Sequence, residues 1–152
     1  METIVVDGHE KESASVYYPD NLYTYGLGPF IGIGILNPKI KKGYLGHFIS
    51  HDKTSAKVLI DLAFLEAKEA GDLEIALAGN MCLPREPVEF DCMDNYDKVL
   101  KSHIVYTVWI KDLLSDYGIT NVQNRFHEEY QEGAYSILVD TMKLKIIVDY
   151  LE

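Results

Sequence analysis

A chain of 152 residues has the length of a single domain, and it can bury most of its apolar surface around one core. Hydrophobic residues make up 47% of it and charged residues 25%, which is typical of a globular protein rather than a disordered one. No stretch approaches the ~20 consecutive apolar residues of a membrane-spanning helix. The N-terminal sequence METIVVDGHEKESAS has the features of neither a secretory signal nor a transit peptide. These observations predict one cytoplasmic domain, residues 1–152, without membrane insertion.

The charge balance is acidic, with 24 Asp and Glu residues against 14 Lys and Arg and a formal net charge of −10. Such a charge opposes binding to a phosphate backbone, so we expect no nucleic-acid partner. The only cysteines are Cys82 and Cys92. A chain of this size without a cysteine framework is typical of a reducing compartment, and we expect both residues to be thiols.

The first half of the chain has the composition of β-strands. β-Branched and aromatic residues dominate five short segments, at 3–7, 13–18, 22–26, 30–36 and 44–50. Turn signals separate the later segments: YPDN at 18–21, NPK at 37–39 and KKG at 41–43. The simplest topology for this succession is a meander of antiparallel strands.

A helical period begins after residue 52. Apolar residues recur on one helical face at Ala56, Leu59, Ile60, Ala63, Phe64 and Ala67. Asp52, Thr54 or Ser55 can cap the start of this helix, because their side-chain oxygens accept hydrogen bonds from the first backbone N–H groups. We expect Gly71 to end the helix in a left-handed turn.

The second half alternates strand and helix signals. A short apolar strand is predicted at 73–79, a loop at 80–97, and a second helix from about Asp94 to Tyr117 with Gly118 as its stop. The apolar stripe of this helix comprises Val99, Leu100, His103, Thr107, Ile110 and Leu114. Strands are predicted at 119–126, 134–140 and 143–151, the last two joined by a tight turn near Thr141 and Met142. The order of elements predicts an α+β domain.

Four glycines lie within nine positions of the strand-rich half: Gly26, Gly28, Gly32 and Gly34. Glycine weakens a strand, so its repeated use indicates a bulge, an irregular turn at GLGP, or the close approach of another backbone. The spacing differs from the dinucleotide-binding pattern G-x-G-x-x-G, and the segment leads into a strand rather than a helix. We expect no nucleotide cofactor.

Two histidines, His47 and His51, are four residues apart in GHFISHD. In an extended strand they share a face but lie about 13 Å apart, too far to share a metal ion. We therefore predict no metal site and place His51 and Asp52 at the exposed start of the first helix.

The segments TYGLGPF at 24–30 and GYLGHFIS at 43–50 together resemble the signature of the CheD family of chemoreceptor glutamine deamidases. In that family a motif like TLGLGSC starts a strand, and G-x-x-H-x-x-L follows in the next. The resemblance implies a Cys that attacks a side-chain amide, a His that acts as its base and a Thr that orients the pair. On this chain the Thr falls on Thr24, the His on His47, and the Cys position on Phe30, 17 residues before His47.

The resemblance continues weakly through the helix at 55–70, through GNM at 79–81 where the family often has GGANM, and through the second helix and the final hairpin. It therefore covers nearly the whole chain. It implies a layered fold shared with bacterial toxin deamidases: a mixed and antiparallel β-sandwich with two main helices packed outside.

The chain departs from the family pattern at the residue that defines the chemistry. Phe30 cannot form an acyl-enzyme, and Pro29 has neither a hydroxyl group nor a backbone N–H that could stabilise an oxyanion. We therefore predict a degenerate CheD-like protein, a non-catalytic binding or regulatory module. Its ligand is expected to be a protein or a small amide-bearing molecule that contacts Gly28, Pro29 and Phe30.

Two alternatives stay open. An amidohydrolase could use His47 with Cys82, or with an activated water, because the carboxylates around Cys92 make that thiol the poorer nucleophile. Alternatively the chain is a structural interaction protein, in which Thr24 and His47 are ordinary strand residues and Cys82 is a small buried side chain.

Two further expectations concern neighbouring segments. The connection NPKIKKG is short enough to pair the strands on either side of it, so Phe30 and His47 should lie close together on antiparallel strands. The acidic run Glu86, Glu89, Asp91, Asp94 and Asp97 is interpreted as a solvated loop leading into a helix N-terminus. It could alternatively dock a basic partner or bind a hard cation.

Overall fold

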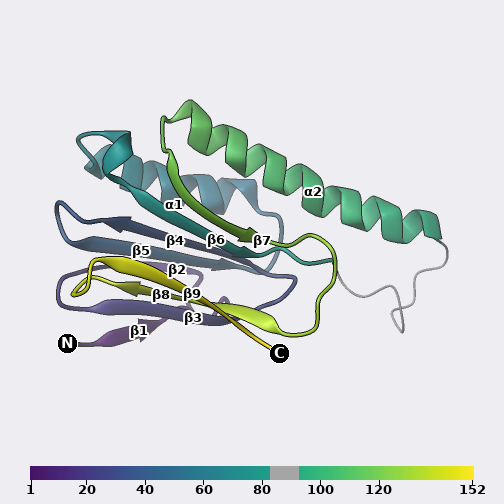
Figure 1. The fold of residues 1–152 in the computed structure, drawn as a ribbon, viewed down its shortest axis with the longest axis horizontal. Coiled ribbons are helices and arrows are strands. Elements are labelled where there is room, and N and C mark those ends of the chain that lie inside the picture. The colour runs from purple at the N-terminus through teal and green to yellow at the C-terminus, as the bar shows by residue number, and fades with distance from the viewer. Residues whose placement is uncertain (83–92) are drawn as a thin grey trace.

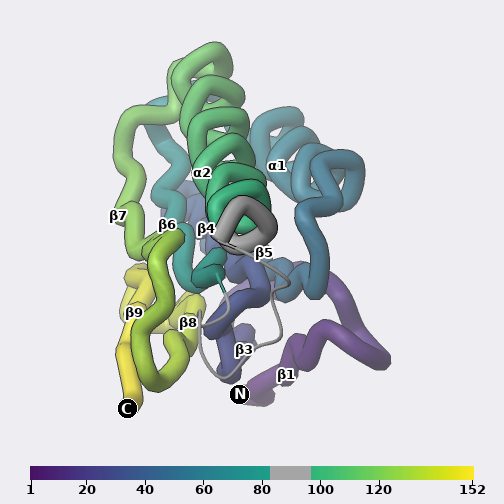
Figure 2. Tube along the Cα trace, turned by 90° about the vertical axis from the view of Figure 1, so that its right-hand side faces the viewer, coloured from purple at the N-terminus to yellow at the C-terminus, as the bar shows by residue number. Residues whose placement is uncertain are grey.

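The structure is a computed structural model that describes the backbone of residues 1–82 and 93–152 and the side chains of residues 1–82 and 97–152. Two β-sheets pack face to face, and two helices cover the outer face of the larger sheet (Figure 1). Viewed at right angles, the helices, the larger sheet and the smaller sheet form three successive layers (Figure 2). The predicted α+β class and the sandwich with helices packed outside are confirmed.

The smaller sheet has the order β1-β3-β8-β9, formed by Thr3–Val5, Asn21–Leu27, Ala134–Asp140 and Lys145–Leu151. The larger sheet has the order β2-β5-β4-β6-β7, formed by Ser13–Tyr17, Lys42–Phe48, Ile31–Asn37, Glu74–Gly79 and Asn121–Phe126. Within the described residues, β1 with β3 and β6 with β7 are the parallel pairs. The remaining strand pairs are antiparallel.

The meander predicted for the first half of the chain is wrong outside the hairpin β4–β5, whereas the separately predicted hairpin β8–β9 is confirmed. β1 pairs with β3 in one sheet, whereas β2 pairs with β5 in the other. The physical reason is that every residue of β4 and β5 is buried, so a layer must cover each face of these strands. The helices cover one face. β3 does not pair with its neighbours in the chain but belongs to the smaller sheet, which covers the other face.

The first helix, α1, spans Lys53–Glu66 and begins as predicted. The Asp52 carboxylate caps it by accepting a hydrogen bond from the Ser55 N–H at 3.0 Å. Its end was predicted wrongly: α1 stops at Glu66, and Gly71 lies in a short 3-10 turn, η1 (Ala70–Asp72). The exposed polar residues that follow Ala67 offer no apolar face that would hold another turn against the sheet.

The second helix, α2, spans Met93–Asp116, close to its predicted bounds. His103, Thr107, Ile110 and Leu114 of the predicted stripe are buried, whereas Val99 is exposed. Gly118 follows in the left-handed region at φ +77°, as a helix stop requires. Neither helix in the described part of the chain is long and apolar enough to cross a membrane. Of the predicted loop at 80–97, residues 83–92 lie outside the described residues.

Three glycines, Gly32, Gly34 and Gly43, allow the two sheets to lie close together. A Cβ atom at Gly32 would lie 2.9 Å from Cδ1 of Ile137, and one at Gly43 would lie 2.7 Å from Cγ1 of Val139. Gly34 faces both of these β8 side chains. The expected bulge is also present: the register of β3 with β8 shifts between Thr24 and Leu27, with Gly26 at φ +68°.

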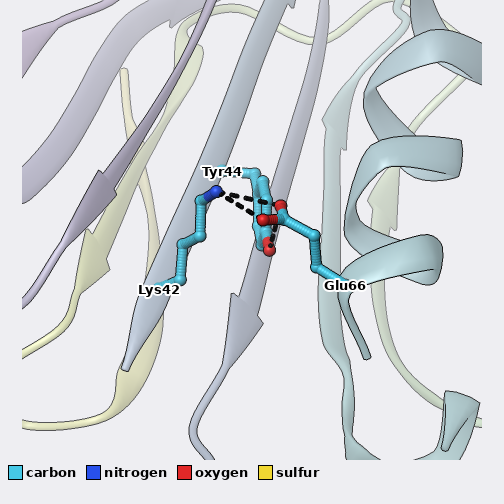
Figure 3. Close-up of polar contacts among 3 residues, drawn as sticks. All are labelled: Lys42, Tyr44 and Glu66. Carbon is cyan, nitrogen blue, oxygen red and sulfur yellow. Dashed lines mark hydrogen bonds and ion pairs between the residues drawn. The ribbon is translucent and has the colours of Figure 1, made fainter. Parts of the chain in front are cut away.

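A polar cluster fixes the end of α1 to β5. Lys42 and Tyr44, both on β5, point toward the carboxylate of Glu66 (Figure 3). The Lys42 ammonium donates to both carboxylate oxygens at 2.9 and 2.8 Å, and the Tyr44 hydroxyl donates to Oε1 at 3.0 Å. Lys42 also lies over the Tyr17 ring, 4.7 Å from its centroid. These hydrogen bonds, that from Lys42 first, hold the pKa of Glu66 below its ordinary value of 4.5.

Gly79→Ala should destabilise the protein by about 2–4 kcal/mol. Gly79 has φ +93°, and a Cβ atom there would overlap the backbone carbonyl oxygen of Phe30, which cannot move as a side chain can. Gly71→Ala is the matched control, because no atom lies within 4 Å of its added Cβ, and its effect should stay within about 0.5 kcal/mol. Urea denaturation measures both, and equal losses would contradict the backbone clash.

Glu66→Gln should destabilise the protein by about 1–3 kcal/mol at pH 7, because the Lys42 side chain is only 9% exposed and would lose its counter-charge. Because the folded-state pKa of Glu66 is lowered, its contribution is present above pH 4.5 and is lost as the pH falls through the folded-state value. The difference from wild type should therefore shrink in acid.

The control is Lys57→Ala, which removes an exposed pair with Asp61 and should cost less than about 0.5 kcal/mol. Denaturation curves at several pH values make the comparison. A Glu66→Gln loss that does not depend on pH would contradict the ionic role of this residue.

Candidate functional site

Thr24 and His47 meet across the interface between the two sheets. Thr24 lies on β3 and His47 on β5, and the Thr24 Oγ1 atom is 2.7 Å from the His47 Nδ1 atom. Both residues are buried, with 0% and 4% of their surface exposed. The contact depends on the glycine-mediated approach of the sheets, because these side chains come from different layers.

The hydrogen bonds of Thr24 fix the tautomer of His47. The Thr24 hydroxyl donates its hydrogen to the carbonyl oxygen of Val6, 2.5 Å away. A hydroxyl has one hydrogen, so Thr24 must accept the bond from His47, and Nδ1 carries the proton. In the neutral ring the other nitrogen, Nε2, then has the lone pair, which is the state that a general base requires.

The N-terminal segment packs against the same ring. The His47 backbone N–H donates to the Glu12 carbonyl oxygen at 2.8 Å. A Cβ atom at Gly8 would lie 2.6 Å from Cδ2 and 3.0 Å from Nε2 of His47, so the backbone at Gly8 covers this edge of the imidazole. Burial lowers the pKa of His47 below 6.5, nearby His9 acts in the same direction, and Asp7 opposes them.

Phe30 lies beside His47, as predicted. It directly precedes β4, whose Gly32 pairs with His47 in the antiparallel ladder to β5. The centroids of the two rings are 5.6 Å apart. Phe30 is half-buried and packs against the core between the sheets. The position that the CheD resemblance gives to the nucleophile therefore holds a phenyl ring in contact with the imidazole.

The turn that carries Gly28 and Pro29 is anchored to the end of β6. The Gly28 carbonyl accepts from Met81 N–H at 2.9 Å, and the Phe30 carbonyl accepts from Asn80 N–H at 2.9 Å. Gly28 is buried and Pro29 is half-buried. The predicted binding residues thus lie in one turn that two backbone hydrogen bonds tie to the end of β6, and Pro29 and Phe30 are its more exposed members.

Cys82 follows β6 and is completely buried. Its backbone N–H donates to the Glu128 carbonyl oxygen at 2.6 Å, which ties this position to the segment after β7. The other cysteine, Cys92, which we expected to be the poorer nucleophile, lies outside the described residues. So do Glu86, Glu89 and Asp91 of the acidic run, and the side chain of Asp94.

A second polar cluster, formed by His51, Asn80 and His103, was missed by the sequence analysis. His51 is half-buried rather than exposed, because the end of β6 and the helix α2 both pass beside it. The Asn80 side-chain oxygen accepts from His51 Nε2 at 2.8 Å and from His103 Nδ1 at 3.0 Å. The Asn80 amide nitrogen donates to the His103 carbonyl and to Thr107 Oγ1, both at 3.0 Å.

The polar groups of the Asn80 side chain are thereby all engaged. Its backbone has φ +61°, a left-handed conformation that asparagine adopts more readily than most residues. Burial lowers the pKa of His103, which favours a neutral ring there. The dipeptide Gly-Asn after an apolar strand is the one sequence signal that marks this position, and it indicates a turn rather than a polar cluster.

The described residues contain no group of three or more His, Cys, Asp or Glu side chains arranged to hold a metal ion. The sequence matches no protein-family model and no curated protein.

Thr24→Val should destabilise the protein by about 2–3 kcal/mol, because it leaves the Val6 carbonyl and the His47 Nδ1–H without a buried partner. Thr24→Ser keeps the hydroxyl and should cost less than about 1.5 kcal/mol. Chemical denaturation gives the stabilities, and the ¹⁵N shifts of the imidazole report the Nδ1–H tautomer in wild type. Equal losses for Val and Ser would contradict the assigned hydrogen-bond chain.

Proposed function

We propose that this chain is a degenerate CheD-like protein that works without covalent catalysis, as a binding or regulatory module. The observation that carries the proposal is the contact between Phe30 and His47, with ring centroids 5.6 Å apart, at the position of the family's nucleophile. The Thr24–His47 pair keeps the geometry of an oriented base. It has no thiol beside it at residue 30, so the base has no nucleophile there to activate.

The surroundings of His47 support a binding role over a catalytic one. His47 is 4% exposed, and the backbone at Gly8 lies against the Nε2 edge of its ring. A substrate amide would have to displace this backbone before it could reach the base. The half-buried ring of Phe30, with Pro29 before it, remains accessible to a ligand. In this proposal these two residues contact a protein or an amide-bearing molecule.

The amidohydrolase alternative requires a nucleophile from elsewhere in the chain. Cys82 is fully buried at the end of β6, so a thiolate attack on a peptide amide needs the surrounding segments to open. An activated water would likewise need access to Nε2 of His47. Both routes demand a rearrangement, whereas the non-catalytic role uses the structure as it stands.

The wild-type protein should release no ammonia from a glutamine-containing peptide above the uncatalysed rate, because residue 30 cannot form a thioester. Phe30→Cys alone should also be inactive, since Pro29 still lacks the N–H and Gly8 still covers the base. A coupled glutamate dehydrogenase assay measures ammonia directly. Turnover in wild type that disappears in Cys82→Ala would replace the proposal with the relocated-thiol hydrolase.

The same peptide, titrated calorimetrically, separates binding from a purely structural role. Wild type should bind it saturably, and Phe30→Ala should weaken binding about tenfold, as expected when a buried aromatic contact is truncated. Met142→Ala, a change at an exposed residue in the distant β8–β9 turn, is the matched control and should bind as wild type does. Absence of binding in wild type would favour the structural interaction protein.

A further inference from the structure

We infer that a hollow between the start of α1 and the N-terminal half of α2 binds a small organic phosphate, meaning a phosphate group attached to an apolar body. The hollow has a volume of about 340 Å³, within the range of small-ligand sites. It lies on the helix-covered side of the larger sheet, away from the Thr24–His47 interface. The inference therefore stands without the proposed function.

Positive charge is concentrated in this hollow although the chain as a whole carries −10. Lys53, Lys98 and Lys101 line it, and none of the described residues that line it carries a carboxylate. Asp52, which lies between His51 and Lys53 in the chain, uses its carboxylate to cap the helix through Ser55 N–H and Oγ, at 3.0 and 2.6 Å. The Lys53 ammonium lies over the Trp109 ring, 5.5 Å from its centroid, so the exposed Lys98 and Lys101 are the cations that can reach the oxygens of a dianion. The acidic remainder of the surface opposes longer phosphate polymers.

The polar floor of the hollow is held in place before a ligand arrives. His51 donates from Nε2 to Asn80 Oδ1 at 2.8 Å, which leaves its Nδ1 atom 3.2 Å from the Ser102 hydroxyl. Its ring stacks on Tyr106, with centroids 5.0 Å apart and an interplanar angle of 23°. Because Nε2 carries the His51 proton, Nδ1 accepts the hydrogen of the Ser102 hydroxyl. This pair therefore fixes the shape of the floor, and Lys98 and Lys101 supply the donors to the phosphate.

One wall of the hollow is apolar, formed by the exposed Val105 with the buried Tyr106 behind it. The Tyr106 hydroxyl is buried and has no hydrogen-bond partner among the described residues. Unpaired buried hydroxyl groups are rare in native proteins. An inorganic anion would contact the lysines and leave this wall uncovered, whereas a phosphate ester with a planar body would satisfy both parts of the hollow.

Phenyl phosphate is the probe, titrated calorimetrically at low ionic strength against inorganic phosphate and benzoate. It should bind saturably, and about tenfold more tightly than either comparison compound, because only it carries both the dianion and the planar body. Lys98→Ala and Lys101→Ala should each weaken it about five- to tenfold, and Lys101→Arg should restore most of the affinity.

Lys111→Ala is the matched control, since Lys111 is an exposed lysine on the same helix that does not line this hollow. It should change the affinity less than twofold, and thermal melts verify that all variants are folded. Failure of phenyl phosphate to bind, or an equal loss in Lys111→Ala, would overturn the site. Equal binding of benzoate would overturn the phosphate assignment, and equal binding of inorganic phosphate would overturn the role of the apolar wall.

Discussion

The close approach of the two sheets is the constraint on which the rest of the molecule depends. β4 and β5 are buried along their whole length, so their inner face must be covered without adding bulk. Gly32, Gly34 and Gly43 achieve this by leaving room for the β8 side chains Ile137 and Val139. The same short separation between layers brings β3 within hydrogen-bonding distance of β5.

The histidines on and after β5 follow from its position in the middle layer. His47 points inward to Thr24, while Tyr44 and Phe48 face the helices. Just past the strand end, His51 meets Asn80 and lies beneath α2. One short segment thus supplies a polar group to each side of the larger sheet. His47, which points inward, is enclosed, whereas His51, on the outer side, borders the lysine-lined hollow. We therefore propose different roles for them.

Local signals in the sequence predicted most of the elements, because their causes are local. Asp52 caps α1 through its own side chain, and Gly118 ends α2 through its own backbone freedom. The proximity of Phe30 to His47 was also predictable, since a short connection joins β4 to β5. The sheet to which each strand belongs was not predictable, because no turn residue indicates that β3 pairs with β8 instead of with its neighbours in the chain.

The candidate site likewise combines features that were predictable from the sequence with features that were not. The resemblance to CheD singled out Thr24 and His47, but the bond from Thr24 to Val6 depends on β1 lying parallel to β3, which has no local signature. The His51 and Asn80 pair was missed for a related reason. Its members come from segments 29 residues apart, after β5 and β6, which pair with opposite edges of β4.

The pairing of β3 with β8 also shapes how the chain must assemble during synthesis. Asn21 lies opposite Asp140, so the smaller sheet cannot close until residue 140 has left the ribosome. Until then β4 and β5 can form their hairpin, but its glycine-lined face has no cover. The nascent chain therefore exposes the apolar face of this hairpin until β8 and β9 have been synthesised, and the pairing of β8 with β3 then covers it.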